Sequence, residues 1–439
     1  MADRTRYDSG MERSLRSVLL GTFTLRFSTG LTGAMLGLYL ASLDDFGGPQ
    51  VNASIVGVFA AIFFLSELVL SPIFGVLSDR IGHHRVMLYG PVFGAIAVIL
   101  TGLTTQLPIL GATRLLEGAS TAASVPSILG FIALATAGNE LLRGKAAARF
   151  EGATLAGLGV GFIVAPKLFE YLGPTAFFLN AVVYGISFLI YWRGVKDPAG
   201  EAEAVAGEHI QATRYLSLIR SSHVLLLAPT WIALNASIGL WFSQSLFQFS
   251  QENPRFPEQW LMTGFDANQI TIAAIGIAVV FGAGLLFWGN RFKSMRRTTI
   301  ILYGVIGGGA LVIAGFVVNH SAGGPLPFVV PLAALGVAGA GLFVLAGATP
   351  AALGLLADIS ERYPSDRGAI MGLYSVFLAI DQITGSLIGG VAADWRGIDG
   401  MLLATGVLLG IALVPLNRLR SQEHEIGASA PVTVGATSA

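Results

Sequence analysis

The sequence predicts an all-α membrane protein with twelve transmembrane helices in two pseudo-symmetric six-helix bundles. Three observations support this fold class. The 439 residues are 54% hydrophobic and only 12% charged, whereas a soluble domain carries about 25% charged residues. Twelve apolar segments each approach the ~20 residues that span a bilayer. A long polar stretch separates the first six segments from the last six.

The twelve segments are expected to be helices, taken in chain order. A backbone inside lipid must satisfy its own hydrogen bonds, and these runs are too long and continuous for the alternating strands of a barrel. The first run is also too long for the core of a cleaved signal peptide. The expected spans are 17–42, 51–77, 86–104, 108–135, 150–171, 174–192, 223–249, 269–289, 299–318, 328–356, 368–393 and 400–417.

Domain boundaries follow from the polar stretches. We expect an N-terminal bundle over 1–192, a cytoplasmic linker over 193–222 and a C-terminal bundle over 223–420. Part of the linker, 210–220, has the pattern of an amphipathic helix at the membrane surface. The small polar residues of 421–439 predict a disordered tail.

The positions of the basic residues predict the orientation, because cytoplasmic loops of membrane proteins are rich in Lys and Arg. With the N-terminus inside, two of the 26 basic residues, Arg255 and Arg396, fall in outer loops, and three lie within spans. All the others fall on the cytoplasmic side. We therefore expect a multi-pass protein of the cell membrane with both termini in the cytoplasm.

Composition and motifs exclude several classes of function. Lys plus Arg equals Asp plus Glu at 26 each, so no net charge attracts nucleic acid. The chain has no cysteine, which excludes disulfides and thiolate metal sites. The segment from Gly138 to Gly144-Lys145 lacks the spacing and the hydroxyl residue of a phosphate-binding loop. The histidines lie in loops or at span ends without a His-Glu-x-x-His motif, so we expect neither an enzyme nor a bound metal or cofactor.

The loop after the second span carries the most specific motif. It reads Gly75-x-x-x-Asp79-Arg80-x-Gly82-x-x-Arg85. This pattern resembles the cytoplasmic loop signature of the major facilitator superfamily, and every fixed position is filled. A polar hairpin between two helices would explain the charges but not their spacing. A weaker copy at 290–297, between the eighth and ninth spans, agrees with a duplicated half.

Two further elements extend the resemblance over most of the chain. In the fourth span, Arg114 and Gly118 are similar to the Arg-x-x-x-Gly element of the superfamily. In the fifth span, Gly152, Gly161 and Pro166 resemble the signature of its proton-coupled exporters. That signature is incomplete, because alanine precedes the proline and the closing glycine pair is missing. Tight helix packing alone would also favour such glycines.

The resemblance implies a function and a mechanism. It implies a secondary transporter that moves a small molecule by alternating access, with the two halves rocking about a site near the middle of the membrane. Asp79 would then latch the halves together on the cytoplasmic side when the transporter opens outward, with Arg80 and Arg85 holding its orientation. Gly75 would permit close helix approach, and Gly82 the turn.

Proton-coupled efflux by antiport is the preferred function, in a monomer within the lipid bilayer. Proton-coupled uptake by symport is the alternative, and a non-transporting sensor or scaffold is a remote third interpretation. The incomplete fifth-helix signature leaves the direction of transport open.

Charged groups within the membrane are expensive and are candidates for proton coupling. Arg26 and Glu67 are expected at the same depth on the first two helices, where an ion pair would form. It would either release on protonation of Glu67 or serve only as a permanent packing bridge. Asp381 is the only acid in the middle of a C-terminal span and has no basic residue nearby. It is either a proton carrier or a neutral, hydrogen-bonded packing acid.

The remaining candidates concern the substrate. The resemblance implies that Arg114 faces the central cavity and serves proton or substrate coupling. Glu117 is expected at the depth of Lys167, where these two could pair. Lys167 is more often an interface residue. Trp231, Asn235 and Phe242 form one stripe of the seventh span. Such a stripe either packs in the core of the bundle or forms an apolar wall of the transport pathway. A wall of this kind suits a hydrophobic or amphiphilic solute.

Overall fold

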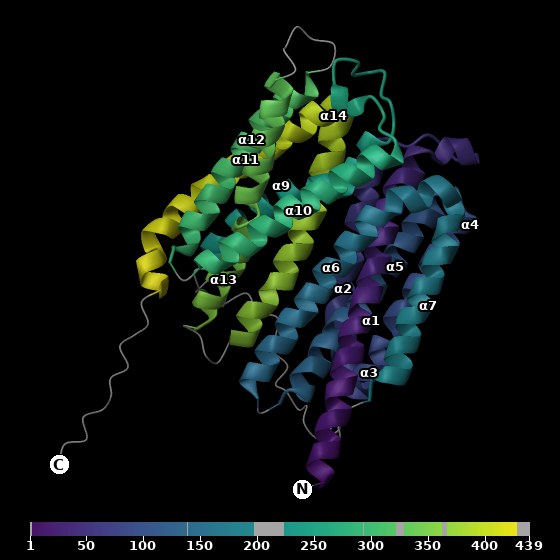
Figure 1. The fold of residues 1–439 in the computed structure, drawn as a ribbon, viewed down its shortest axis with the longest axis vertical. Helices are drawn as coiled ribbons and strands as arrows, with labels where there is room; N and C mark the ends of the chain where they lie inside the picture. Colours follow the sequence, from purple (N-terminus) through teal and green to yellow (C-terminus); the bar gives the residue numbers. More distant parts are fainter. Residues whose placement is uncertain are drawn as a thin grey trace, which may run out of the picture.

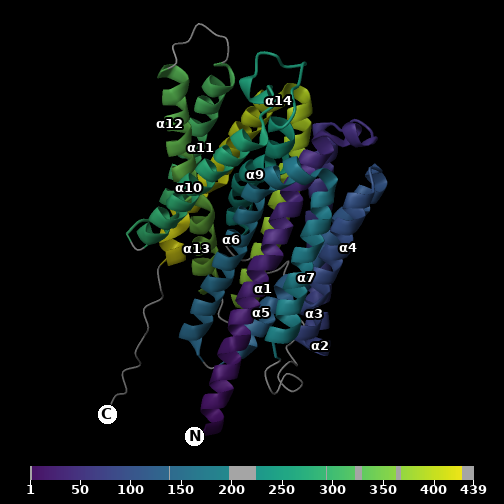
Figure 2. The same ribbon diagram turned by 45° about the vertical axis from the view of Figure 1, so that its right-hand side comes forward.

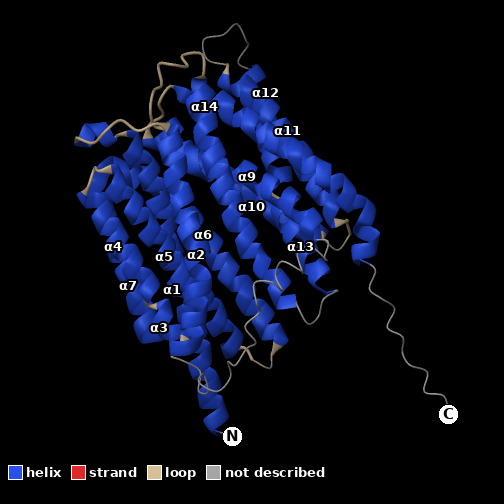
Figure 3. Cartoon of the chain, turned by 180° about the vertical axis from the view of Figure 1, so that it is seen from behind, coloured by secondary structure: helices blue, strands red, loops and turns tan. Residues whose placement is uncertain are grey.

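The computed structural model describes residues 2–137, 139–196, 224–292, 294–321, 329–361 and 367–427. The described residues are helices joined by short loops, and no strand is drawn among them (Figure 3). The predicted all-α fold class is confirmed. Most of the expected linker, including 210–220, and most of the expected tail lie outside the described residues. The start of that tail is a correction, because the last helix continues to Gly427.

The N-terminal half contains seven helices in the described residues. They are α1 (Ala2–Ala41), α2 (Ala53–Ile81), α3 (His83–Met87), α4 (Tyr89–Leu103), α5 (Leu107–Ala135), α6 (Glu140–Leu172) and α7 (Ala176–Gly194). Two short 3-10 turns, η1 (Leu43–Phe46) and η2 (Gly173–Thr175), lie in its loops. The third expected span is therefore a short helix followed by a longer one.

The C-terminal half contains the remaining helices of the described chain. They are α9 (Val224–Phe249), α10 (Ala267–Arg291), α11 (Arg297–Asn319), α12 (Val329–Leu345), α13 (Ala348–Glu361) and α14 (Arg367–Gly427), with the 3-10 turn η3 (Trp260–Met262) in the loop before α10. The tenth expected span is divided into α12 and α13. The two last expected spans form α14, which bends at Arg396 and Gly397, where the backbone is not helical.

Membrane crossing is supported by length and composition. Nine helical stretches of the described chain are long and apolar enough to span a bilayer. Two of these stretches are long. Leu142–Gly194 has 53 residues and contains most of α6 together with α7, and Leu373–Gln422 has 50 residues and contains the bend of α14. Large apolar side chains remain exposed, for example Leu286 at 75% and Ile313 at 70%, as expected for surfaces that face lipid. The total of twelve crossings stays a prediction.

Close packing of helices at glycine residues occurs in both halves. In Figure 1, α1–α7 lie together on one side and α9–α14 on the other, and Figure 2 keeps this division. A β-carbon added at Gly157 of α6 would lie 2.5 Å from the Phe23 carbonyl oxygen of α1. One added at Gly385 of α14 would lie 2.5 Å from the Ala236 carbonyl oxygen of α9. In each half, a glycine of the fifth expected span, in α6 or α14, thus lets that span contact the backbone of the first span, α1 or α9.

The halves meet at one end of the molecule. We call this the outer end and the opposite end, where Asp79 lies, the inner end, after the predicted orientation. One hydrophobic cluster joins Leu31 and Tyr39 of α1 to Leu246 and Phe247 of α9, near its outer end. The inner part of the C-terminal half, around Trp231, forms a separate cluster. The described core is therefore continuous between the halves only towards the outer end.

Candidate transport site

The C-terminal half contains a fully buried carboxyl group. Asp381 lies on α14 and has no exposed surface. Its Oδ2 accepts a hydrogen bond from Trp231 Nε1 of α9 at 3.1 Å, and its Oδ1 accepts one from Gln382 Nε2 at 3.0 Å. Among the described residues, no Lys or Arg forms an ion pair with it. Two neutral dipoles, rather than a cation, compensate this carboxyl group.

The position of Trp231 is fixed by aromatic and polar neighbours. Its ring lies edge-on to Tyr374 at 5.6 Å and tilted against Phe377 at 6.3 Å between centroids. Asn235, one turn further along α9, donates to the Trp231 carbonyl oxygen at 3.0 Å and accepts from Thr349 Oγ1 of α13 at 2.7 Å. The indole N–H is thereby held towards Asp381, and three helices contribute to one polar cluster.

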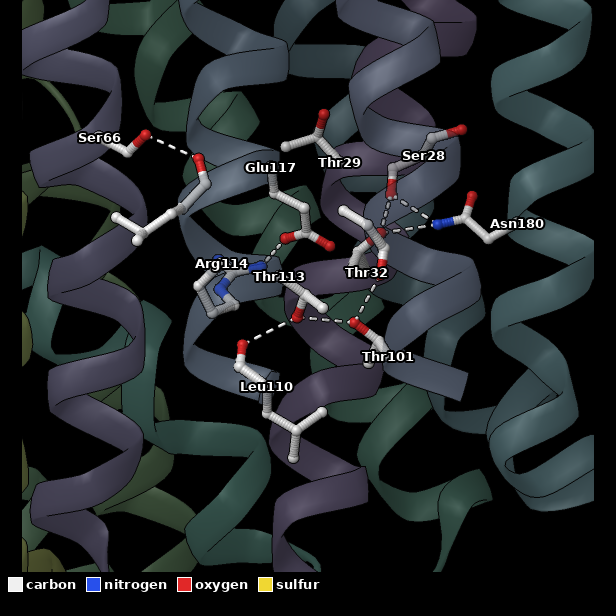
Figure 4. A network of polar contacts seen from close by, with 12 residues as sticks. Ser28, Thr29, Thr32, Ser66, Thr101, Leu110, Thr113, Arg114, Glu117 and Asn180 are labelled. Carbon is white, nitrogen blue, oxygen red and sulfur yellow. Dashed lines mark hydrogen bonds and ion pairs between the residues drawn. The ribbon is translucent and has the colours of Figure 1, made fainter. Parts of the chain in front are cut away.

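The N-terminal half contains a different arrangement of buried charge. Arg114 and Glu117 of α5 form an ion pair with each other, and their side chains are only 8% and 4% exposed. The guanidinium also lies 4.8 Å from the centre of the Phe63 ring of α2. Figure 4 shows the two side chains pointing towards one another within the bundle. Arg114 Nε and Glu117 Oε1 have no hydrogen-bond partner among the described residues.

Hydroxyl and amide groups surround this pair (Figure 4). Asn180 of α7 donates to Thr32 Oγ1 of α1 at 2.7 Å and to the Ser28 carbonyl oxygen at 3.1 Å. Thr101 of α4 donates to Thr113 of α5 at 2.9 Å. The centre of the N-terminal half is thus polar and internally bonded, as expected for charged groups within a membrane.

The predicted ion pair of Arg26 and Glu67 is not present. No ion pair joins them, although both are described. Arg26 instead lies against α6, where a β-carbon added at Gly157 would be 2.9 Å from the Arg26 β-carbon. Equal depth along two helices does not fix the rotation of each helix, so depth alone could not predict direct contact.

The predicted contact between Glu117 and Lys167 is also absent. Glu117 pairs with Arg114 on its own helix. Lys167 forms an ion pair with Glu170 at 2.7 Å, and both side chains are partly exposed near the outer end of α6. The interface interpretation of Lys167 agrees with this position. Arg114 is nearly inaccessible and is directed at α2, so it does not line an open cavity in this conformation.

The predicted stripe of α9 divides into two parts. Trp231 is fully buried and Asn235 is 5% exposed, so both belong to the cluster of Asp381. Phe242 is 63% exposed, and its ring lies 6.2 Å from that of Phe162 on α6, nearly perpendicular to it. Phe242 is therefore at the interface between the halves.

The loop motif forms the predicted turn but with other partners. Gly82 has φ +99° between α2 and α3, a conformation that favours glycine. Asp79 Oδ1 lies 3.8 Å from His83 Nε2, whereas Arg80 and Arg85 are exposed and form no ion pair with it. The expectation that these arginines orient Asp79 is not met.

Three glycine positions of the motifs differ in their surroundings. A β-carbon at Gly75 would be 3.8 Å from the nearest atom, so this glycine permits no unusually close approach, contrary to expectation. Gly161 of α6 packs against the Phe27 carbonyl oxygen of α1, whereas Gly152 has open space around it. Pro166 lies inside α6. Close helix packing thus explains Gly161 but not Gly152.

Sequence reasoning missed several contributors to these clusters. Tyr374 and Thr349 gave no signal, because an aromatic or hydroxyl residue in a span is common. His83 and His84 were set aside as loop residues, yet His83 is buried and His84 Nε2 contacts the Tyr191 carbonyl oxygen of α7 at 3.0 Å. The Arg114 and Glu117 spacing of three residues was a readable signal for a helical pair.

The arrangement of two buried polar centres in two packed halves can now be compared with known proteins. The family model described as Major Facilitator Superfamily matches residues 18–344, which is most of the chain. The chain belongs to the major facilitator superfamily. As a superfamily member it is a multi-pass membrane protein and a transporter of small molecules, and not an enzyme.

Curated relatives of this superfamily member include bacterial resistance proteins. Multidrug resistance protein 1 of Bacillus subtilis is 25% identical over 372 residues, which cover 83% of this chain and 87% of the relative. Quinolone resistance protein NorA of Staphylococcus aureus is 21% identical over 420 residues, 93% of this chain and 97% of the relative. The similarity therefore extends through both halves of the superfamily fold.

A solved structure confirms the fold independently. The crystal structure of nucleoside transporter NupG matches with a TM-score of 0.67 at 15% identity and covers 93% of this chain and 98% of that chain. At this identity the match concerns the superfamily fold alone.

Proposed function

We propose that this transporter exports a small hydrophobic or amphiphilic solute in exchange for protons. The observation that carries the proposal is the buried carboxyl of Asp381, which has dipolar partners and no ion-pair partner in the described chain. Such a group can be neutral or charged at moderate cost, because its hydrogen bonds compensate part of the charge. A carboxyl locked in an ion pair would not change its charge so readily.

The two halves would then have separate tasks. Asp381 exchanges the proton, and its bond to Trp231 links its charge to the packing of α9 against α14. In the N-terminal half, the neutral pair of Arg114 and Glu117 adds no net charge to the interior. Phe242 and Phe162 supply apolar contacts between the halves. The names of the relatives, which concern multidrug and quinolone resistance, support export of amphiphilic compounds.

The test uses proteoliposomes with an imposed pH gradient. Two probes suit an apolar pathway, namely ethidium and the quinolone norfloxacin. Antiport predicts that an acidic lumen drives external probe into the vesicles, whereas symport predicts uptake with an alkaline lumen. Movement of neither probe under either gradient would contradict the proposed solute class.

The Asp381→Asn variant tests the proton carrier. Asparagine preserves the shape and one acceptor but cannot change its charge. We expect it to lose gradient-driven accumulation by at least about tenfold, since the coupled proton is lost, while exchange of probe for probe continues. The exposed Asp45→Asn variant is the control and should accumulate probe normally. Undiminished gradient-driven accumulation by Asp381→Asn would remove Asp381 from the mechanism.

A further inference from the structure

Close contacts between the halves occur at the start of α2. A β-carbon added at Gly390 of α14 would lie 2.7 Å from the Ala53 carbonyl oxygen, and Gly57 of α2 packs against the Ser386 carbonyl oxygen of α14. In addition, Gln244 Nε2 of α9 donates to the Ala53 carbonyl oxygen at 3.1 Å. Two helices of the C-terminal half therefore meet the start of one helix of the N-terminal half.

The first amides of α2 are capped by both halves of the molecule. The first N–H groups of an α-helix lack partners within the helix. Ile55 N donates to the side chain of Asn52, the local cap, at 3.0 Å. Ala53 N and Ser54 N instead donate to Oδ1 and Oδ2 of Asp394, each at 2.9 Å. Asp394 lies on α14, about 340 residues away, so the other half completes the cap.

This contact combines geometry with charge. Both oxygens of one carboxylate are used, and charge-assisted hydrogen bonds are stronger than neutral ones. The N-terminus of a helix also carries a partial positive charge that favours an anion. The contact is breakable, because the amides and the carboxylate can each bind water instead when the halves separate.

The opposite end of α2 is not joined in this way. Asp79, near the inner end of the same helix, has a side chain that is 46% exposed, and its Oδ1 lies 3.8 Å from His83 Nε2 of its own half. A carboxylate thus bridges the halves at the outer end of α2, while the acid at the inner end stays within its own half. The structure accordingly represents a state closed at the outer end.

We propose that Asp394 is the outer latch of the transport cycle. It holds the outer end closed by capping α2, and it must release both amides before the halves can open outward. The inference rests on alternating access, which is part of the proposed function, but not on the solute or on proton coupling. It makes Asp394 a positioning residue for the conformational change rather than a residue that touches the solute.

The latch is tested by distances between spin labels in lipid nanodiscs. The chain has no native cysteine, so labels can be placed without removing any residue. One labelled pair reports the outer end, at Asp45 and Glu258, and another the inner end, at Ala148 and Ser294, all of them exposed. In Asp394→Ala we expect the population open at the outer end to rise by at least about tenfold, since two bonds to a charged group are lost. The inner distances should shorten in the same molecules.

Two further variants separate a latch from a merely structural cap. Asn52→Ala removes a bond at the same helix start, but within one half, so it should lower stability and leave both distance distributions unchanged. Asp394→Asn retains one acceptor and should give an intermediate shift, which also covers the case that Asp394→Ala folds poorly. Unchanged distances in Asp394→Asn and Asp394→Ala, or an equal shift in Asn52→Ala, would overturn the proposal. The measurement needs no solute, so failure of the transport assay leaves it intact.

Discussion

The two halves of this transporter bury charge in different ways. In the N-terminal half, Arg114 and Glu117 neutralise each other on one helix. In the C-terminal half, Asp381 is buried with Trp231 and Gln382 as neutral donors. The same helix packing therefore holds two polar centres with opposite properties. A compensated pair resists a change of charge, whereas a carboxyl with dipolar partners can undergo one, so duplication of a fold need not duplicate its chemistry.

The largest effect is expected from breaking the compensated pair. Arg114→Met leaves Glu117 buried without a cation, which typically costs about 3–5 kcal/mol in folding free energy. Unfolding in mixed micelles should show this loss, whereas the exposed Arg255→Met control should be nearly neutral. The double variant Arg114→Met, Glu117→Leu should recover much of the loss, because both charges are gone. A single variant as stable as the wild type would mean that the pair does not differ from a surface ion pair.

A smaller effect should distinguish a charged Asp381 from a neutral packing acid. Trp231→Phe removes a donor to the carboxyl group, and a bond to a charged group is worth about 1.5–3 kcal/mol. Trp241→Phe is the matched control, because Trp241 Nε1 of the same helix donates to the neutral Thr405 Oγ1 of α14 at 2.9 Å. We expect the first variant to lose more stability in the same unfolding assay. Equal losses would favour the neutral acid.

The smallest effects concern the feature that the halves share. Gly161→Ala and Gly385→Ala each place a methyl group against the backbone of the first helix of their half, and overpacking of this kind costs about 1–3 kcal/mol. Similar losses in the two variants would support equivalent packing. Gly152→Ala has space for the methyl group and should gain up to about 1 kcal/mol from helix propensity. A loss in Gly152→Ala would instead indicate a role for this glycine in another conformation.

Much of the architecture follows from local patterns in the sequence. The apolar runs predicted the helices, because a backbone in lipid has no other partner for its hydrogen bonds. The loop motif predicted the turn at Gly82, because a positive φ favours glycine. Asp381 could be singled out because a span with one acid and no base is conspicuous by composition alone. The pair of Arg114 and Glu117 was also within reach, since it is set by helix periodicity.

Contacts between helices had to come from the tertiary structure. Counting residues gives the depth of a side chain but not the rotation of its helix, so the ion pair predicted for Arg26 and Glu67 from their equal depth does not form. The hydrogen bond from the Trp231 indole to Asp381 joins segments 150 residues apart. The hydrogen bonds from the first amides of α2 to the Asp394 carboxylate join segments about 340 residues apart. The sequence by itself determined which groups are buried in the membrane. Only the packing of the helices decided which of them meet, because that depends on the orientation of every helix at once.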